Sequence, residues 1–161
     1  PAFVVHRLDR AATGLMLVAH RKRVATRLGE LFQARAVEKR YRAVVHRVFP
    51  PTPQPVRIDT AVDGREACSH VTRLAGDPDL DRSLLEVVIE TGRKHQIRIH
   101  LAGTGFPVVG DRLYGPGGDA EDLQLAASFL AFRCPVDDEE KRFQLPEALL
   151  PALNGANPDR G

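Results

Sequence analysis

The sequence predicts an α+β fold in which a mixed, largely antiparallel β-sheet is flanked by a few helices. Three observations predict it. Stretches typical of strands outnumber stretches with helical periodicity. Most strand segments follow one another through short turns such as Asp63-Gly64, as in antiparallel hairpins. The length of 161 residues is that of a single domain able to bury a core, and we expect one catalytic domain over residues 1–161.

The N-terminal part contains a short strand end at residues 3–5 and a continuous apolar run at residues 14–19, which predicts a buried strand. Residues 21–35 predict a helix, because apolar residues recur there on one face. The residues of that stripe are Val24, Leu28, Leu31 and Phe32. Residues 37–48 alternate between two faces and predict a strand, with Lys39 and Tyr41 on the same face.

A proline-rich connector at residues 49–55 leads to a predicted hairpin of residues 56–62 and 67–74, followed by a strand at residues 83–90. Thr91-Gly92 offers an N-cap for a short helix at residues 93–102. The later elements are predicted as strand-like material at 108–109, 123–132 and around Phe143, a short helix at 146–153, and a frayed tail at 154–161.

The formal net charge of +2 conceals an uneven distribution. Residues 1–47 carry 11 Lys or Arg and 3 Asp or Glu, whereas the remaining residues carry 12 and 18. Such a basic N-terminal third suggests a face that binds an anion. The alternative is a solvated, arginine-rich face without a ligand.

Several classes of site and location are disfavoured. No apolar run approaches the roughly 20 residues of a membrane span. His95 and His100 are poorly spaced for a shared metal ion, and glycine-rich phosphate loops do not occur. Cys68 and Cys134 form no C-x-x-C motif, so we expect reduced thiols and a cytoplasmic location, with no metal and no membrane partner.

Asp9 stands in "HRLDR", where neighbouring cations favour the charged form of a carboxylate. It could be a nucleophile or an electrostatic anchor, or form a structural salt bridge. Tyr41, in "EKRYRAVV", could stack on a nucleobase or be an ordinary half-buried tyrosine. A third segment, residues 90–115, places basic and polar side chains on one short helix, where they could bond phosphates, backbone or a base edge.

These three segments resemble the motifs of the RluA-type pseudouridine synthases. "HRLDR.ATGL" is similar to the catalytic loop of that family, "VEKRYRAVV" to its tyrosine strand, and "TGRKHQIRIHLAGTGFPVVGDRLYG" to its third motif. The late segment "LAASFLAFRCP…RFQLP" resembles the closing strands. Family members carry further strands ahead of "HRLDR", so we expect a pseudouridine synthase fold that is truncated at its N-terminus.

The resemblance implies a monomeric enzyme that isomerises uridines of ribosomal or transfer RNA without cofactor or metal. Asp9 matches the catalytic aspartate, Tyr41 the active-site tyrosine, and Arg98 the arginine that pairs with the aspartate. Residues expected to contact RNA are Arg7, Arg10, Lys39, Arg93, Lys94, His95 and Gln96. The alternatives are an inactive RNA-binding module on the same fold and, less favoured, a metal-dependent nuclease.

Two departures from the family pattern stand out. The usual Thr-Ser-Gly after the aspartate is Ala12-Thr13-Gly14 here, and a common Leu-His-Ala is Leu125-Ala126-Ala127. The first removes a loop hydroxyl and the second a hydrogen-bonding imidazole.

Overall fold

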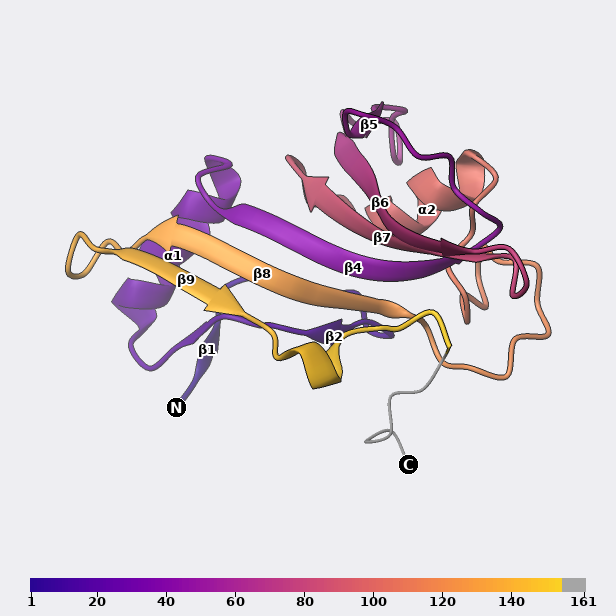
Figure 1. Cartoon of the computed structure of the whole chain (residues 1–161). Coiled ribbons are helices and arrows are strands. Elements are labelled where there is room, and N and C mark those ends of the chain that lie inside the picture. The colour runs from indigo at the N-terminus through magenta and orange to yellow at the C-terminus, as the bar shows by residue number, and fades with distance from the viewer. Residues whose placement is uncertain (155–161) are drawn as a thin grey trace.

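A seven-stranded β-sheet organises the structure, a computed structural model that describes residues 1–154 (Figure 1). The strands follow the order β2-β8-β4-β7-β6-β5, and β9 pairs with β8 beside this path. Their bounds are β2 Thr13–Gly14, β4 Glu38–His46, β5 Val56–Ile58, β6 Ser69–Asp77, β7 Arg82–Ile89, β8 Leu125–Arg133 and β9 Glu140–Gln144. Strands β2 and β8 pair in parallel and the other pairs of the sheet are antiparallel, which confirms the predicted fold class.

Two α-helices accompany this sheet in the described part of the chain: α1 (Lys22–Gln33) and α2 (Gln96–Gly103). A separate two-stranded sheet pairs β1 (Phe3–Val4) with β3 (Val18–Ala19), and η1 (Glu147–Leu149) is a 3-10 turn. In Figure 1, α1 lies near one end of the long strands β4 and β8, whereas α2 lies beside β6 and β7 at the other end. Within residues 1–154, no helix has both the length and the apolar character needed to cross a bilayer.

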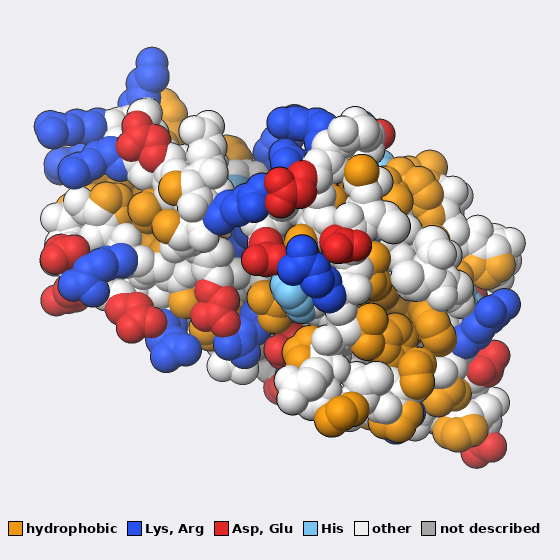
Figure 2. All heavy atoms as spheres, turned by 90° about the horizontal axis from the view of Figure 1, so that it is seen from above, with side chains coloured by type: hydrophobic (Ala, Val, Ile, Leu, Met, Phe, Trp, Pro, Cys, Tyr) orange, Lys and Arg blue, Asp and Glu red, His pale blue; other side chains and the backbone are white. Residues whose placement is uncertain are grey.

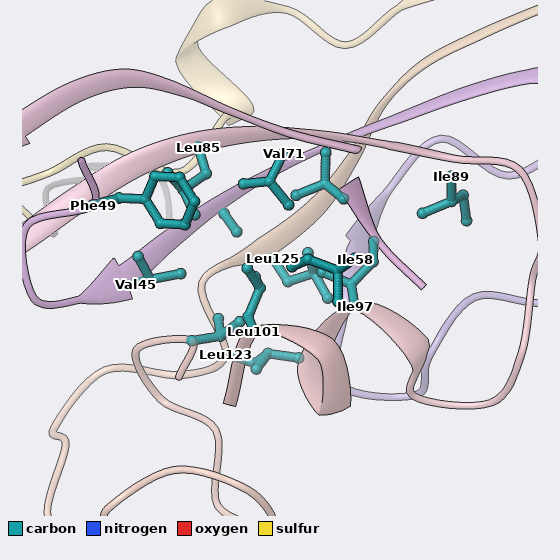
Figure 3. Packing of buried hydrophobic residues seen from close by; sticks show 13 residues of the cluster. Val45, Phe49, Ile58, Val71, Leu85, Ile89, Ile97, Leu101, Leu123 and Leu125 are labelled. Atoms are coloured by element: carbon teal, nitrogen blue, oxygen red, sulfur yellow. The ribbon is translucent and has the colours of Figure 1, made fainter. Parts of the chain in front are cut away.

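The main hydrophobic core lies between α2 and the sheet. Ile97 and Leu101 of α2 are directed toward Ile58 and Leu125 of the strands (Figure 3). Burying a side chain of this size contributes about 1.5–3 kcal/mol, so these contacts hold α2 against the sheet. The position of α2 in turn sets the position of the polar side chains at its N-terminus.

A second core joins α1 to the far end of the sheet. The predicted apolar stripe of α1 packs there, with Leu28 buried against Leu130 and Phe132 of β8. Alternation along β4 is also confirmed, because Ala43 and Val45 are buried in the main core and Tyr41 packs against it.

The predicted buried strand at residues 14–19 is wrong. The run is divided between β2 and β3, which pair with two different partners, and Met16 and Val18 are 48% and 44% exposed. The segment therefore lies at the margin of the molecule, where an apolar run is only half covered.

Other boundaries also differ from the predictions. Helix α2 begins at Gln96 rather than residue 93, because His95 takes a left-handed backbone conformation with φ 57°. Val108 forms an isolated bridge with Val45 rather than a strand, and the predicted helix at 146–153 is reduced to η1. Residues 155–161 of the predicted tail lie outside the described residues.

Strand β8 brings the N-terminal loop next to Tyr41. Ala127 of β8 pairs with Gly14 on one side and with Tyr41 on the other. Gly14 has φ +110°, and a Cβ there would lie 2.3 Å from the carbonyl oxygen of Ala127. Glycine at this position therefore permits the close pairing that holds the loop of residues 6–12 against the sheet.

We predict that Gly14→Ala lowers the free energy of unfolding by about 1–3 kcal/mol or more. The new methyl group would meet backbone atoms of Ala127, and the φ at this position is unfavourable for alanine. The matched control is Gly103→Ala, where nothing lies within 4 Å of the added Cβ and stability should be unchanged or slightly raised. Urea unfolding of both variants measures the difference. Equal stability of the two would contradict the tight pairing of β2 with β8.

Candidate active site

A cleft of about 1050 Å³ opens between the loop at residues 6–10, the start of β4 and the segment that joins β7 to α2. Every residue predicted for catalysis or RNA contact lines it. These are Arg7, Asp9, Arg10, Lys39, Tyr41, Arg93, Lys94, His95, Gln96 and Arg98. In Figure 2, Lys and Arg side chains gather on both sides of the hollow in the surface.

The guanidinium of Arg98 joins two carboxylates. Its Nη1 donates to Oδ2 of Asp9 at 2.7 Å, so the predicted Asp9–Arg98 pair is present. Its Nε and Nη2 donate to Asp111 at 3.0 and 2.5 Å, in a two-point arrangement that suits a planar guanidinium. The residues Arg98 and Asp111 are buried, while the side chain of Asp9 keeps 11% of its surface exposed and can meet a ligand.

Asp111 is the fully buried partner of Arg98 in the series of charged side chains Asp9–Arg98–Asp111. Burial opposes its ionisation, but hydrogen bonds from Arg98 and from the backbone N–H groups of Tyr114 and Leu113 outweigh burial and lower the pKa of the carboxyl. The hydrogen bond to Asp111 is also the largest of the contributions that raise the pKa of Arg98, so the guanidinium carries its charge throughout.

His95 faces Asp9 from the same end of α2. Its Nε2 lies 3.8 Å from Oδ2 of Asp9, and its Nδ1 lies 2.8 Å from the hydroxyl of Tyr114. The left-handed backbone of His95 is uncommon for a residue other than glycine, and it turns this side chain into the cleft at the point where the helix starts.

Tyr41 contributes an aromatic ring beside Asp9. Burial, and then the charge of Asp9, raise the pKa of Tyr41 to about 12. The phenol is therefore protonated at neutral pH. Ile89, Ile97 and Leu125 line the cleft beside it and give this part an apolar lining.

The predicted RNA-binding residues differ in how accessible they are. Arg7, Arg10 and Lys94 are exposed. Burial, and then the neighbouring charge of Arg35, lower the pKa of Lys39, which is half-buried below the rim.

Gln96 is buried, and its side chain is engaged inside the protein. Its amide nitrogen donates to the carbonyl oxygen of Cys68 and to Oγ of Ser69, and its amide oxygen accepts from Thr91 and from the backbone of Arg93. These bonds fix the start of α2 to β6, and the expected contact of Gln96 with RNA stays a prediction. Thr91, expected as an N-cap, acts through Gln96 instead.

Asp111 and Tyr114 contact the predicted site residues but were not singled out from the sequence, although both lie within residues 90–115. The only signal was an acidic residue directly after Gly110, in "VVGDRLYG". Among the described residues, the His, Cys and carboxylate atoms close enough together to hold a metal ion belong to Cys68, His70 and Glu90 rather than to the group around Asp9.

His6 fastens the loop that carries Asp9. Its Nε2 accepts a hydrogen bond of 2.9 Å from the backbone N–H of Leu17, and its ring stacks on Phe32 with centroids 4.5 Å apart. Burial, followed by the charge of Lys39, lowers the pKa of His6 and keeps the accepting nitrogen unprotonated.

Comparison with known proteins identifies the family. Residues 1–103 match the model of the RNA pseudouridylate synthase family. The chain belongs to this family. The predicted resemblance to the RluA-type pseudouridine synthases is thereby confirmed, and the cleft with Asp9 is the candidate active site of a pseudouridylate synthase domain.

Individual relatives agree with this assignment. An uncharacterised RNA pseudouridine synthase of Chloroflexus aurantiacus is 40% identical over 162 residues, covering 92% of this chain and 50% of the relative. Ribosomal large subunit pseudouridine synthase D of Xanthomonas campestris pv. campestris is 37% identical over 171 residues, covering 90% of this chain and 51% of that protein. The chain thus spans about half the length of the curated relatives that it matches.

The fold is shared with a solved human structure of the family. Human RNA pseudouridylate synthase domain containing 1 superposes with a TM-score of 0.80 at 25% sequence identity, over 95% of this chain and 72% of that chain.

We predict that Asp111→Asn lowers the free energy of unfolding by about 3 kcal/mol, because it leaves the buried Arg98 with one carboxylate partner in place of two. Asp138→Asn removes a carboxylate from an exposed pair with Arg133 and should leave stability unchanged within error. Urea unfolding at neutral pH compares the variants. Similar stabilities would show that Asp111 is not the anchor of this pseudouridylate synthase site.

A second prediction concerns pH. The pKa of His6 is lower in the folded state, so the unfolded chain takes up a proton first on acidification. The free energy of unfolding should therefore fall as the pH drops below about 6.5, the ordinary value for histidine, and recover above it. In His6→Asn this part of the slope should be smaller, as measured by urea unfolding at a series of pH values. An equal slope in the variant would contradict the role of His6.

Proposed function

We propose that this chain isomerises selected uridines in RNA to pseudouridine, with Asp9 as the essential acidic residue. The observation that carries the proposal is the Asp9–Arg98–Asp111 chain, whose outer carboxylate meets the cleft beside Tyr41. Membership of the pseudouridylate synthase family supports the same reaction.

The substrate uridine must leave the RNA stack before Asp9 can reach it. Flipping a nucleotide out costs a few kcal/mol, which the protein must return through stacking and hydrogen bonds. A cleft of about 1050 Å³ has room for one nucleotide. Tyr41 and the apolar side chains near it provide a surface for the base, and stacking on an aromatic ring is worth roughly 1–3 kcal/mol.

The reaction breaks the N1–C1′ bond of the uridine and forms a C5–C1′ bond; the proton on C5 leaves to solvent, and N1 takes up a proton from solvent. Asp9 could attack C1′, attack C6 of the ring, or remove a proton from the sugar, and each of these roles needs an aimed carboxylate. Arg98 orients this carboxylate, because its Nη1 donates to Oδ2 of Asp9 at 2.7 Å while Asp111 holds the guanidinium in place.

Tyr41 is the candidate for the final proton transfer. Its pKa of about 12 makes the phenol a poor base while Asp9 is charged. Part of that increase comes from Asp9, so bond formation by Asp9 would remove this part, whereas burial, the larger cause, would still keep the phenol protonated. Tyr41 would therefore act as a relay, passing its own proton to water as it accepts the proton from C5.

Basic side chains around the cleft would hold the RNA backbone. Arg7 and Arg10 flank Asp9 in sequence, Lys94 lies at the opposite side before α2, and Lys39 lies below the rim. Arg93 and His95 complete the set, although Nε of Arg93 also donates to the carbonyl oxygen of Glu66. Phosphate contacts of this kind position the substrate without reading its sequence.

The RNA class is proposed to be ribosomal or transfer RNA. One relative is named as a ribosomal large subunit pseudouridine synthase, which favours ribosomal RNA. We further propose that the protein acts in the cytoplasm, as a monomer, and without cofactor or metal in the reaction itself.

The test is Asp9→Asn. We expect the variant to lose turnover by at least about a thousandfold, because an amide cannot replace the carboxylate as nucleophile or base. Release of the C5 proton from RNA transcripts labelled with tritium at C5 of uridine measures turnover, and filter binding measures RNA affinity, which should change little. Asp138→Asn is the control that should keep activity, because Asp138 is exposed and is not among the residues that line the cleft.

Two outcomes would defeat the proposal. Appreciable turnover by Asp9→Asn would remove Asp9 from the mechanism. Salt-dependent binding of RNA by the native chain, without release of tritium from any ribosomal or transfer transcript, would instead indicate an RNA-binding module without activity.

A further inference from the structure

A cluster of three metal-ligating side chains lies on the sheet next to the active-site cleft. Cys68 immediately precedes β6 and His70 is its second residue, so the two point to the same face of the strand. Glu90 follows β7 and lies beside Cys68, because its backbone N–H donates to the carbonyl oxygen of Cys68 at 3.1 Å. The intervening Ser69 bonds to α2, and the cluster therefore faces away from that helix.

The three side chains converge on one point. Sγ of Cys68 lies 3.5 Å from Nε2 of His70, and the same nitrogen lies 3.0 Å from Oε2 of Glu90. One ligand atom from each of the three residues lies within 4.8 Å of the others. In a tetrahedral zinc site, with distances of about 2.3 Å to sulfur and 2.0 Å to nitrogen or oxygen, a sulfur and a nitrogen ligand lie roughly 3.5 Å apart and a nitrogen and an oxygen ligand roughly 3.3 Å.

A catalytic relay fits this cluster less well than a metal site. In a nucleophile–base–acid relay the thiol and the acid contact opposite nitrogens of the imidazole, whereas here both contact Nε2.

The backbone of Cys68 is held in place independently of any ion. Its N–H donates to Oγ1 of Thr91, and its carbonyl oxygen accepts from the amide of Gln96. The nearby Arg57, opposite His70 in the ladder, forms an ion pair with Asp59, so its charge is compensated on the same part of the sheet.

We propose that Cys68, His70 and Glu90 form a binding site for a thiophilic divalent cation, with Zn²⁺ as the ion that the donor set suits best. Three protein ligands leave a coordination position for solvent. The proposal does not depend on the proposed function, and it concerns a site apart from Asp9.

A bound ion would change the charge of the cleft. Glu90 and Asp9 are the carboxylates among the residues that line it, and Glu90 stands next to the segment with Arg93 and Lys94. A cation on Glu90 would cancel a negative charge near the expected path of the phosphates. Through Cys68, Thr91 and Gln96 it would also stiffen the connection to the start of α2.

Titration with Co²⁺ tests the site, because cobalt occupies zinc sites and reports its ligands in its absorption spectrum. The reduced chain, freed of metal with a chelator, should bind one Co²⁺ and show a thiolate-to-cobalt charge-transfer band with the intense visible bands of four-coordination. Addition of Zn²⁺ should bleach them. His70→Ala and Glu90→Gln should each weaken binding by at least about tenfold.

The two cysteines supply the matched comparison. Cys68→Ser should lose the charge-transfer band, whereas Cys134→Ser should keep it, and circular dichroism should show that both variants are folded. The proposal is overturned if the native chain shows no thiolate band, or if the band survives in Cys68→Ser. It is equally overturned if His70→Ala and Glu90→Gln bind Co²⁺ as tightly as the native chain.

Discussion

The candidate site depends on the two ion pairs that the guanidinium of Arg98 forms with Asp9 and Asp111. The guanidinium ties together three segments that are distant in sequence: the loop with Asp9, helix α2, and the turn with Asp111. A buried arginine without partners would be very costly, so the two carboxylates and the guanidinium stabilise one another or fail together. Two negative charges surround one positive charge, which leaves a net negative charge at the end that faces the cleft. Asp9 is thus oriented without being neutralised.

In the proposed function, the residues around Asp9, Arg98 and Asp111 separate binding of the RNA backbone from the chemistry on the base. Exposed cations such as Arg7 and Lys94 stand at the cleft, where a polyanion can exchange their water and counterions for phosphates. The carboxylate and the aromatic ring of Tyr41 lie deeper, beside apolar side chains that hold water away. A phosphate backbone would therefore be attracted to the rim, while a base that leaves the stack would find the apolar interior.

Periodic patterns and short motifs carried most of what could be predicted from the sequence. The stripe of α1 and the alternation of β4 depend on local geometry, which is why both are present as expected. The partnership of Arg98 with Asp9 came from a resemblance, because no local rule links residues so far apart. Asp111 was missed for the same reason: its importance lies in a tertiary contact and leaves no periodic trace.

The errors have physical causes as well. An apolar run such as residues 14–19 has the same appearance whether its partners cover both faces or only part of one. The start of α2 was misplaced because a left-handed backbone at His95 is chosen by packing, against its intrinsic preference. Glu90 joins Cys68 and His70 only through the register of β6 and β7, which a spacing pattern along one strand does not contain.

The parallel pairing of β2 with β8 has a consequence for the order of folding. Thr13 pairs with Ala126, so the strand contact nearest to the loop with Asp9 spans most of the chain. Hairpins such as β6–β7 close over short distances and can form early, whereas a contact of this length forms late because its loop-closure entropy is large. Strand β2 would stay unpaired until β8 is available, although His6 and the pairing of β1 with β3 already hold neighbouring residues through local contacts. The loop with Asp9 would therefore take its final place against the sheet only after most of the described fold has formed.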